Sequence, residues 1–382
     1  MWEELPKYFL HYHMRILYIT TIGTTVGFFK YLIRELIDEG NTVDIATNES
    51  ENKVAEYYKG WGCKIFDISC SRSALTKGNI DAIKEIRQII AENNYDIVHC
   101  HTPIAAACAR IACRKQRKLG LKVIYTAHGF HFYIGAPLKN WLIYYSVEWL
   151  CSWWTDVLIA INKEDYFIAK KHLHAKDTEY VPGVGIDLSK FLNRTDGRER
   201  KRRELGLSNE RMMLLSIGEL NENKNHESVI KAIEGIESLT YVIVGKGGTK
   251  EKLQRLKGEI DVDVRLMGYR SDVSDFYDAA DVYILPSIRE GLNVSLMEAM
   301  ASGLPCLCGN IRGNVDLIDD NGGYLFDPSS VNDIRNTVQK AVQLSKEERK
   351  EQGYHNLEKV RGFDKSAVNS QMKRVYETVY GC

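Results

Sequence analysis

Two carboxylates, Glu290 and Glu298, stand with seven residues between them in a stretch that predicts the start of a helix. Residues 295–301 are strong helix formers, and Gly291 and Asn293 interrupt the chain just before them. A helix that begins near Asn293 directs its unpaired backbone N–H groups and the positive end of its dipole toward Glu290. Such a helix start binds anions, typically phosphate, and carboxylates beside it accept hydrogen bonds from sugar hydroxyls. The stretch therefore predicts a nucleotide-sugar site; the open alternative is a solvated glutamate and a favourable charge near a helix start.

The same residues, followed by Ala-Met-Ala-Ser-Gly at 299–303, resemble the E-x(7)-E signature of family 4 of the retaining glycosyltransferases. The resemblance extends over nearly the whole chain from Met14. It implies the GT-B architecture: two Rossmann-like doubly wound α/β domains that face each other across a cleft, with a C-terminal helix that crosses back to the first domain. It also implies that Glu290 holds sugar hydroxyls and Glu298 the ribose. The donor diphosphate is then expected at the backbone amides of Gly291, Leu292, Asn293 and Val294.

The first element needed to position such a site is a strand, glycine loop and helix near the start of the chain. Residues 15–20 form a short β-branched run, residues 21–27 a loop of small residues, and residues 28–39 have apolar side chains at helical spacing. This order is typical of the opening of a doubly wound domain. By resemblance, Gly23 in the loop approaches the donor diphosphate, although glycine turns occur in many such units.

Further apolar runs alternate with helical patterns, which predicts a parallel sheet covered on both faces. The runs are 42–47, 64–68, 96–100, 122–126 and 157–162. Ligands bind such sheets beyond the carboxyl ends of the strands, and His128 follows one of these ends. His128 matches the family histidine whose imidazole meets the donor sugar or the reacting centre; a structural role is the alternative, and His131 is the weaker candidate. His99 and His101 have no third residue at a spacing that predicts a metal site.

The second half begins again with a strand, residues 212–217, followed by a loop that contains Lys224. Lys224 matches a family lysine that contacts the donor diphosphate. Many family members have an arginine directly after the preceding glycine, where this chain has Glu219. Because lysine binds phosphate only as a point charge, the missing guanidinium is a real loss, for which Arg270 or Arg289 could compensate.

Two more strands are predicted at 241–245 and 262–267, and the loop after the second matches the family segment that contacts the nucleotide base. The expected base contacts are Tyr269 and Arg270. Asp261 and Asp263 imitate a metal-binding D-x-D motif, but that motif normally ends an apolar strand and this pair begins one. We therefore expect neither a metal nor another cofactor, with a UDP-sugar as co-substrate.

The order of these segments predicts two domains and a final helix. The first domain is expected at residues 14–190, the nucleotide-sugar domain at 205–362, and the helix that returns to the first domain at 363–382. A chain of 382 residues is long enough for two cores of ordinary size.

Composition limits the partners. The 51 basic and 51 acidic residues cancel, so no overall field favours nucleic acid. Two basic runs, 110–122 and 198–203, are either solvated helix faces or points of attraction to an anionic membrane. Nine cysteines without a C-x-x-C pair predict a reducing cytoplasm, and residues 1–13 contain no long apolar run of a signal peptide.

The segment 130–154 is crowded with aromatic residues, which either pack between domains or meet lipid headgroups. Glu148 and Asp156 interrupt the most apolar window of the chain, residues 141–161, so no membrane-spanning helix is predicted. Within the family, this segment resembles capsule and exopolysaccharide enzymes. It implies a polyprenyl-diphosphate-linked glycan as acceptor and peripheral contact with the inner face of the cell membrane.

These observations predict a retaining glycosyltransferase that moves an N-acetylhexosamine or hexose from a UDP-sugar to an acceptor hydroxyl. Its expected catalytic residues are His128, Glu290 and Lys224. Two alternatives remain: a UDP-sugar 2-epimerase of the same fold, and a non-catalytic subunit of a polysaccharide assembly complex, which Glu219 favours. Incubation with a UDP-sugar and no acceptor separates the first, because only an epimerase converts it.

Overall fold

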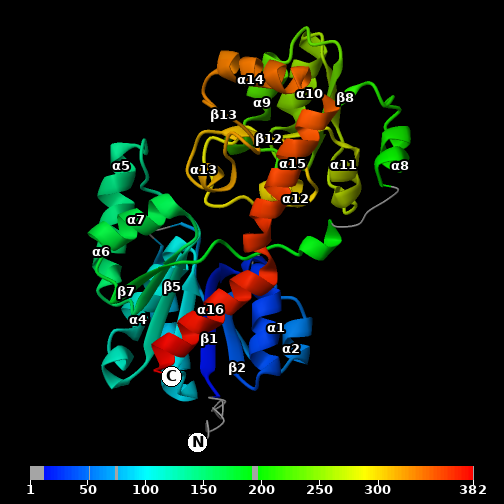
Figure 1. Cartoon of the computed structure of the whole chain (residues 1–382). Coiled ribbons are helices and arrows are strands. Elements are labelled where there is room, and N and C mark those ends of the chain that lie inside the picture. Colours follow the sequence, from blue (N-terminus) through cyan, green and yellow to red (C-terminus); the bar gives the residue numbers. More distant parts are fainter. Residues whose placement is uncertain (1–12, 51, 74–75, 192–196, 382) are drawn as a thin grey trace, which may run out of the picture. The chain divides into compact units, whose positions relative to one another are not determined.

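The computed structural model describes residues 13–50, 52–73, 76–191 and 197–381. The chain divides into two compact units (Figure 1). Unit 1 contains Met1–Val184 together with Asn369–Cys382, and unit 2 contains Gly185–Val368. Each unit is built around its own parallel β-sheet.

The described part of unit 1 contains a seven-stranded parallel sheet with the order β3-β2-β1-β4-β5-β6-β7. Its strands are β1 (Arg15–Ile22), β2 (Thr42–Asn48), β3 (Ile65–Asp67), β4 (Ile97–His101), β5 (Lys122–Ala127), β6 (Val157–Ala160) and β7 (Asp177–Tyr180). The strands predicted from apolar runs are β1 to β6, with ends shifted by at most two residues. Edge strand β7 was not predicted, because its sequence Asp-Thr-Glu-Tyr has no apolar run.

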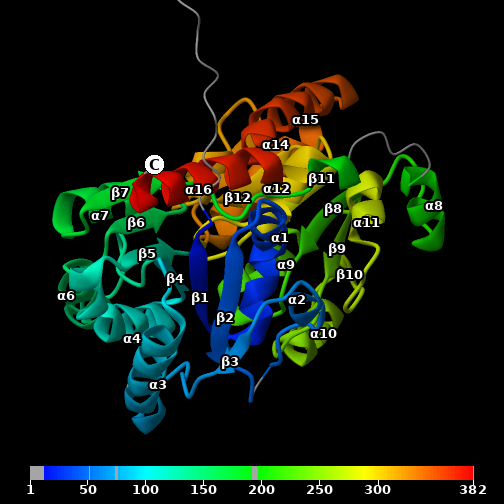
Figure 2. The same cartoon turned by 90° about the horizontal axis from the view of Figure 1, so that it is seen from below.

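Helices cover both faces of this sheet. They are α1 (Lys30–Asp38), α2 (Tyr57–Gly60), α3 (Lys77–Asn93), α4 (Pro103–Cys113), α5 (Leu138–Asn140), α6 (Ser146–Ser152) and α7 (Lys163–His172), with the single-turn segments η1 (Gly23–Phe29), η2 (Gln116–Leu119) and the π-helical η3 (Trp141–Tyr145). Figure 2 shows α3 and α4 on one side of the strands and α16 (Lys365–Tyr380) on the other.

Helix α16 spans the residues predicted for the last helix and packs on unit 1 through its second half. Tyr376 is fully buried, and its hydroxyl is hydrogen bonded to the hydroxyl of Tyr18 on β1. Lys373 forms ion pairs with Glu35 and Glu39 at the end of α1. These contacts explain why the chain beyond Asn369 belongs to unit 1.

The described part of unit 2 contains a six-stranded parallel sheet with the order β10-β9-β8-β11-β12-β13. Its strands are β8 (Met212–Ile217), β9 (Leu239–Val244), β10 (Asp263–Leu266), β11 (Val282–Leu285), β12 (Cys306–Gly309) and β13 (Gly323–Phe326). Its helices are α8 (Gly197–Glu204), α9 (His226–Ala232), α10 (Lys250–Glu259), α11 (Val273–Ala279), α12 (Val294–Ala301), α13 (Asn314–Leu317), α14 (Val331–Gln343) and α15 (Lys346–Val360), with the short turns η4 (Leu188–Lys190), η5 (Glu222–Lys224) and η6 (Arg361–Phe363).

Side chains of α11, α12 and α15 pack on one face of this sheet, and those of α9, α10 and α14 on the other. The chain order reverses between β8 and β11, since β9 and β10 lie to one side and β12 and β13 to the other. In open α/β sheets ligands bind at this kind of switch point, beyond the carboxyl ends of the strands. In unit 1 the corresponding point lies between β1 and β4.

Each basic run has members that are buried in ion pairs, whereas others, such as Arg114, Lys115 and Arg203, are exposed. On α4, Arg110 is fully buried and paired with Glu148 at 2.8 Å. In η2, Arg117 donates hydrogen bonds to both carboxylate oxygens of Asp156. On α8, Lys201 and Arg202 are each 1% exposed and paired with carboxylates of the same unit. Sequence patterns of charge are local, so they could not predict that these basic residues pair with acidic residues far away in the chain. Residues 192–196, between the two predicted domains, lie outside the described residues.

Candidate functional site

The helix predicted at the E-x(7)-E segment is present as α12, and it follows the carboxyl end of β11. Asn293 is its N-cap: the side-chain oxygen accepts a hydrogen bond from the backbone N–H of Leu296 at 3.0 Å. Ser295 donates to the same oxygen at 2.7 Å, which holds the cap in place. Leu292 and Val294 pack against the hydrophobic core of unit 2, so the chain approaching the helix is fixed on its inner side.

The structure brings Lys224 and Glu290 together although 65 residues separate them in the chain. Lys224 Nζ lies 2.7 Å from Glu290 Oε1, and the two side chains are 15% and 13% exposed. Lys224 extends over Gly218 at the end of β8, and Glu290 follows β11, so the pair sits at the switch point of the sheet. A partly solvated cation beside the start of a helix provides two sources of positive potential for an anion.

Several residues that the sequence did not single out hold this pair in register. Asn223 donates from its side chain to the carbonyl of Arg289 at 2.9 Å. Asn225, in a left-handed conformation with φ of 53°, donates to the carbonyl of Pro286 at 3.2 Å. Asparagine tolerates that conformation better than other non-glycine residues, which is the signal that could have marked it.

The loop after β12 also packs against the backbone of Glu290 and Gly291. Arg312 is buried and donates from Nε to the carbonyl of Glu290 at 3.1 Å. Gly313 has φ of 78°, and any Cβ there would collide with the carbonyl of Gly291. The backbone of residues 286–291 is therefore held by Asn223 and Asn225 at residues 286 and 289 and by this loop at residues 290 and 291.

Glu298 points into unit 2 from the first turns of α12. Its Oε2 accepts a hydrogen bond from the hydroxyl of Tyr277 at 2.9 Å. Burial raises the pKa of the Glu298 carboxyl, while the hydrogen bond from Tyr277 works in the opposite direction. One carboxylate oxygen is thus engaged by the protein, and among the described residues no hydrogen bond engages the other.

A pocket of about 540 Å³ opens beyond the carboxyl ends of β8, β9 and β10. It is lined by Ile217, Gly218, Glu219, Val244, Gly245, Lys246, Gly247, Tyr269, Arg270 and Val273. Tyr269 is 73% exposed, and Lys246 Nζ lies 5.4 Å from the centre of its ring. The loop residues predicted to meet the nucleotide base therefore line a pocket that adjoins Gly218, over which Lys224 extends.

Glu219 lines this pocket, and so does Arg270, one of the two residues suggested to compensate for the missing arginine. Arg270 is bound to both carboxylate oxygens of Asp272, at 2.8 and 2.7 Å, and also to Glu204. The Nε and Nη2 edge of its guanidinium is therefore occupied within the protein, and this edge binds Asp272 in the bidentate way in which an arginine would bind a diphosphate. Arg289 is exposed at the loop before Glu290.

The D-x-D imitation lies at the opposite end of the sheet. Asp263 is the first residue of β10, and its carboxylate accepts hydrogen bonds from Thr240 and Arg265. These partners hold the pKa of Asp263 below its usual value, against the effect of burial. Asp261 and Asp263 are therefore separated from the strand ends at which Lys224 and Glu290 meet. In the described residues there is no group of three or more His, Cys, Asp or Glu side chains that could hold a metal ion.

In unit 1 the corresponding strand ends gather His128, His101 and the η1 loop. His128 Nε2 lies 3.3 Å from His101 Nδ1, and the ring of Phe29, the last residue of η1, lies 5.7 Å from that of His128. Burial lowers the pKa of His128 to about 4, so its imidazole is neutral at pH 7. His131 turns elsewhere and packs on the ring of Tyr144 at 4.6 Å.

Gly23 is the first residue of η1, directly after β1. A Cβ at this position would collide with the backbone of Asn52 and Val54. The glycine is therefore required by the packing of the protein on itself, whether or not a diphosphate also approaches it.

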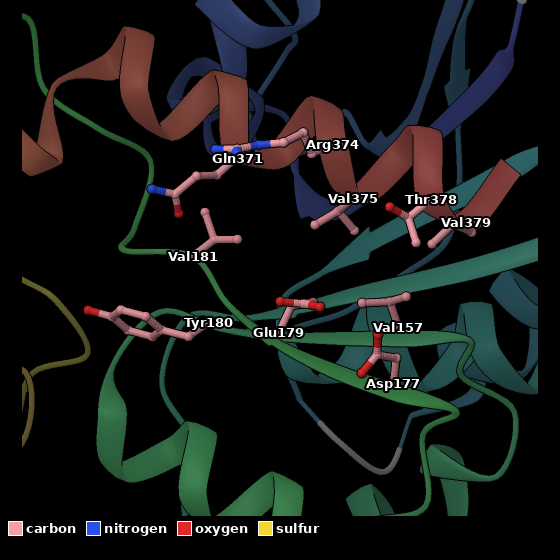
Figure 3. Close-up of a pocket in the computed structure, with 10 residues that line it drawn as sticks. All are labelled: Val157, Asp177, Glu179, Tyr180, Val181, Gln371, Arg374, Val375, Thr378 and Val379. Atoms are coloured by element: carbon pink, nitrogen blue, oxygen red, sulfur yellow. The ribbon is translucent and has the colours of Figure 1, made fainter. Parts of the chain in front are cut away.

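A second pocket in unit 1, of about 250 Å³, lies between edge strand β7 and helix α16 (Figure 3). Asp177 and Glu179 enter it from the strand, and Arg374 and Gln371 from the helix. None of the predicted site residues lines it. The two carboxylates on this strand would repel a diphosphate, so this pocket does not suit a nucleotide sugar.

Comparisons with known proteins show the family of the chain. Residues 197–358 match the family described as Glycosyl transferases group 1, and residues 15–162 match Glycosyl transferase 4-like. The putative glycosyltransferase EpsD of Bacillus subtilis (strain 168) is 38% identical over 68% of this chain and 71% of that protein. The UDP-Gal:alpha-D-GlcNAc-diphosphoundecaprenol alpha-1,3-galactosyltransferase of Escherichia coli is 31% identical over 70% of this chain and 72% of that protein.

Among solved structures, Anabaena Alr3699/HepE in complex with UDP and glucose matches 96% of this chain and 100% of that chain, with a TM-score of 0.77 at 16% identity. Two parallel-sheet Rossmann-like domains with this likeness define the GT-B class of fold. The chain belongs to the group 1, family 4-like glycosyltransferases, as the E-x(7)-E segment predicted.

Proposed function

We propose that this protein transfers a sugar from a UDP-sugar, with retention of anomeric configuration, to a hydroxyl of a lipid-linked glycan in surface polysaccharide synthesis. The observation that supports it most directly is the pair of Lys224 and Glu290 at the start of α12. The Escherichia coli relative is named for transfer from UDP-Gal to a diphosphoundecaprenol-linked sugar, and the Anabaena structure contains UDP and glucose. The proposed sugar is a hexose or an N-acetylhexosamine.

The difficult step is separation of a diphosphate from the anomeric carbon, which builds negative charge on the leaving group. Lys224 and the backbone N–H groups of residues 291–294 stabilise that charge. Glu290 accepts hydrogen bonds from sugar hydroxyls and, through its ion pair, keeps the Lys224 ammonium in position. No protein nucleophile is invoked, because the donor phosphate accepts the proton of the acceptor hydroxyl. The charge of the diphosphate is met without a metal.

The remaining donor contacts follow from the pocket beside the pair. The exposed ring of Tyr269 contacts the base, and Arg270 stabilises the loop through its hydrogen bonds to Asp272. Glu298, with Tyr277 on one oxygen, accepts from the ribose hydroxyls through the other. From unit 1, Gly23 is assigned to the diphosphate and His128 to the sugar.

The test is a panel of UDP-sugars, each incubated with the purified protein and with synthetic polyprenyl-diphosphate-linked monosaccharides. We expect one donor to be consumed only when an acceptor is present, and NMR of the product to give the same anomeric configuration as the donor. Conversion of a UDP-sugar without acceptor would instead identify the 2-epimerase. No binding of any UDP-sugar by calorimetry would favour the non-catalytic subunit.

A lipid-linked acceptor requires the protein to work at a membrane, and an apolar ridge on unit 1 supports this. The ridge is formed by the exposed side chains of α5, η3, α6 and the residue that follows: Leu138, Leu142, Ile143, Val147, Trp149, Leu150 and Trp153, which are 40% to 81% exposed. Between Ile134 and Trp153 the only acidic residue is Glu148, which is buried against Arg110. An apolar surface with indole rings and no exposed acid suits the headgroup region of a bilayer.

This ridge replaces the basic run as the proposed contact. Of the aromatic residues in the segment, Phe130 and Phe132 belong to the core, whereas Trp149 and Trp153 remain at the surface. No helix within the described residues has the length and apolar character needed to span a membrane. We propose peripheral docking at the cytoplasmic face, which also accords with eight free, buried cysteines in the described chain.

Flotation with vesicles that contain anionic lipid tests the docking. The variant Leu142→Ser/Ile143→Ser is expected to bind at least ~10-fold more weakly, because burial of each such side chain is worth about 1.5–3 kcal/mol. The control is Ile80→Ser, which removes a side chain that is 59% exposed on α3 of the same unit. If the ridge variant and the control bound vesicles equally, the ridge would not be the membrane contact, and a soluble acceptor would be the remaining proposal.

A further inference from the structure

Strand β4 ends in two histidines, His99 and His101, that are both fully buried. His99 uses both ring nitrogens: Nδ1 lies 2.6 Å from the hydroxyl of Tyr376, and Nε2 lies 2.8 Å from that of Thr126. His101 uses one. Its Nδ1 lies 3.3 Å from Nε2 of His128, and its Nε2 has no hydrogen-bond partner among the described residues.

The ring of His101 is held in this orientation from both sides. It stacks on Phe29 at 4.0 Å between centroids, and the ring of His99 lies 4.1 Å away. Tyr18 stacks at a longer distance, 5.5 Å. These contacts fix the plane of the ring. A half-turn of the ring would keep the same stacking but would place Cδ2 instead of Nδ1 opposite His128, and the hydrogen bond between the two histidines would be lost, so the orientation with Nδ1 toward His128 is favoured.

One proton must lie between His101 and His128. Burial lowers the pKa of His101 well below its usual value and that of His128 to about 4, so both rings are neutral near pH 7. A neutral imidazole has one N–H and one lone pair. Either His128 donates from Nε2 or His101 donates from Nδ1.

The two arrangements differ in what they leave buried. If His128 donates, the proton of His101 must be on Nε2, which leaves a buried N–H without a partner. If His101 donates from Nδ1, its Nε2 is only an unused lone pair. Orphaned buried N–H groups are rarer in proteins than under-used acceptors, so the second arrangement is favoured.

We propose that His101 is a positioning residue that fixes His128 as the Nδ1–H tautomer. His128 Nδ1 has no hydrogen bond to a described residue, and the side chain is half-buried rather than enclosed. It therefore presents an N–H donor to an oxygen of a bound sugar and cannot act as a base through that nitrogen. This consequence for turnover rests on the proposed transferase function; the tautomer itself does not.

Long-range proton–nitrogen correlation spectra of the histidine-labelled protein at pH 7 test the tautomer without any substrate. A His128→Gln variant assigns the signals. We expect His128 to be protonated at Nδ1 and His101 at Nδ1. Protonation of His128 at Nε2 in the wild-type protein overturns the proposal.

Two substitutions then test the consequence. His101→Asn keeps an N–H donor close to the position of Nδ1, and His101→Leu removes it. We expect Asn to retain the tautomer and a kcat within about threefold of wild type, whereas Leu loses the tautomer. With Leu, kcat should fall about 10- to 100-fold, as for outer-shell partners of other functional histidines, with a smaller change in KM.

His131→Asn is the matched control, since its ring packs on Tyr144 and not in this cluster. A wild-type kcat in a folded His101→Leu protein would overturn the positioning role. If the wild-type protein transferred no sugar at all, the transferase proposal would fail, and the wild-type spectra would still decide the tautomer.

Discussion

The strand ends of unit 2 gather charged side chains, whereas those of unit 1 gather neutral histidines and tyrosines. In unit 2, Lys224 and Glu290 form an ion pair that keeps some contact with solvent. In unit 1, His99, His101 and Tyr376 are fully buried, and burial lowers the histidine pKa values. The corresponding regions of the two sheets therefore differ in charge: an ion pair lies in unit 2, and neutral buried side chains lie in unit 1.

The difference fits a division of labour. A diphosphate that gains charge during the reaction needs a fixed cation and backbone N–H groups, and these are found in unit 2. Neutral donors such as an imidazole N–H can orient a sugar hydroxyl without competing for the diphosphate. If this division is correct, changes in unit 2 should affect turnover most, and unit 1 should respond most strongly to acid.

The largest expected effect is that of Lys224→Ala. Removal of one donor to a developing anion typically costs about 10²- to 10³-fold in kcat, and here it also leaves Glu290 without its cation. Steady-state kinetics with the identified donor and acceptor measure it. Lys252→Ala is the control, because Lys252 pairs with Glu222 and Glu227 on the surface of the same unit. If the two variants had equal kcat, Lys224 would not be a catalytic group.

Next in size is the contrast between the two glutamates. Glu290→Ala should lower kcat, since Glu290 is proposed to orient the sugar and its carboxylate holds Lys224. Glu298→Gln should mainly raise the donor KM, by about tenfold, because an amide accepts from ribose hydroxyls less strongly than a carboxylate. Tyr277→Phe removes the hydrogen bond to Glu298 and is the matched control for its orientation. Wild-type kinetics in both glutamate variants would make α12 a purely structural helix.

The third effect concerns stability. Burial lowers the pKa of His99 to about 3 and of His128 to about 4, and also depresses that of His101; in unit 2 the described residues contain one such histidine, His226, at about 3. A histidine with a depressed folded-state pKa takes up its proton on unfolding, so its stabilisation is present above about pH 6.5 and is lost as pH falls toward the folded value.

Each such proton contributes a slope of about 1.4 kcal/mol per pH unit, so unit 1 should lose stability more steeply than unit 2 between pH 6.5 and 5. Hydrogen exchange resolved by peptide at pH 7.5, 6.5 and 5.5 measures this after correction for the intrinsic rate. A parallel loss of protection in the two units would contradict the contrast between a neutral and a charged cluster.

How much of this could be read from the sequence also differs between the units. Helix α12 was predicted because its signals are local: helix formers, an interrupting Asn293 and a terminal Gly303 with φ of 69°. The first six strands of unit 1 follow from apolar runs, but β7 has none. The sequence could not reveal that Lys224 meets Glu290, that Arg270 is taken up by Asp272, or that Arg110 is buried, since each depends on a partner far along the chain.

His101 shows the same limit in unit 1. Its spacing from His99 suggested metal ligation, which was rejected for lack of a third ligand, and the sequence offered no further role. Only the fold brings it to 3.3 Å from His128, from a different strand end. Local patterns predict elements; the chemistry of a site depends on which elements the topology makes neighbours.

The smallest expected effect is that of chelation, for which we expect no loss of activity. Lys224 and the start of α12 supply positive potential where the diphosphate is proposed to bind. Transfer is therefore expected to proceed at an unchanged rate in EDTA, and added Mn²⁺ or Mg²⁺ should not accelerate it. The informative comparison is with Lys224→Ala: if a divalent ion rescued that variant, the ion would be replacing the lysine at the diphosphate. Loss of wild-type activity in EDTA, restored by Mn²⁺, would mean that the charge of unit 2 alone is not enough, and Glu219 would be the first residue to test as a ligand.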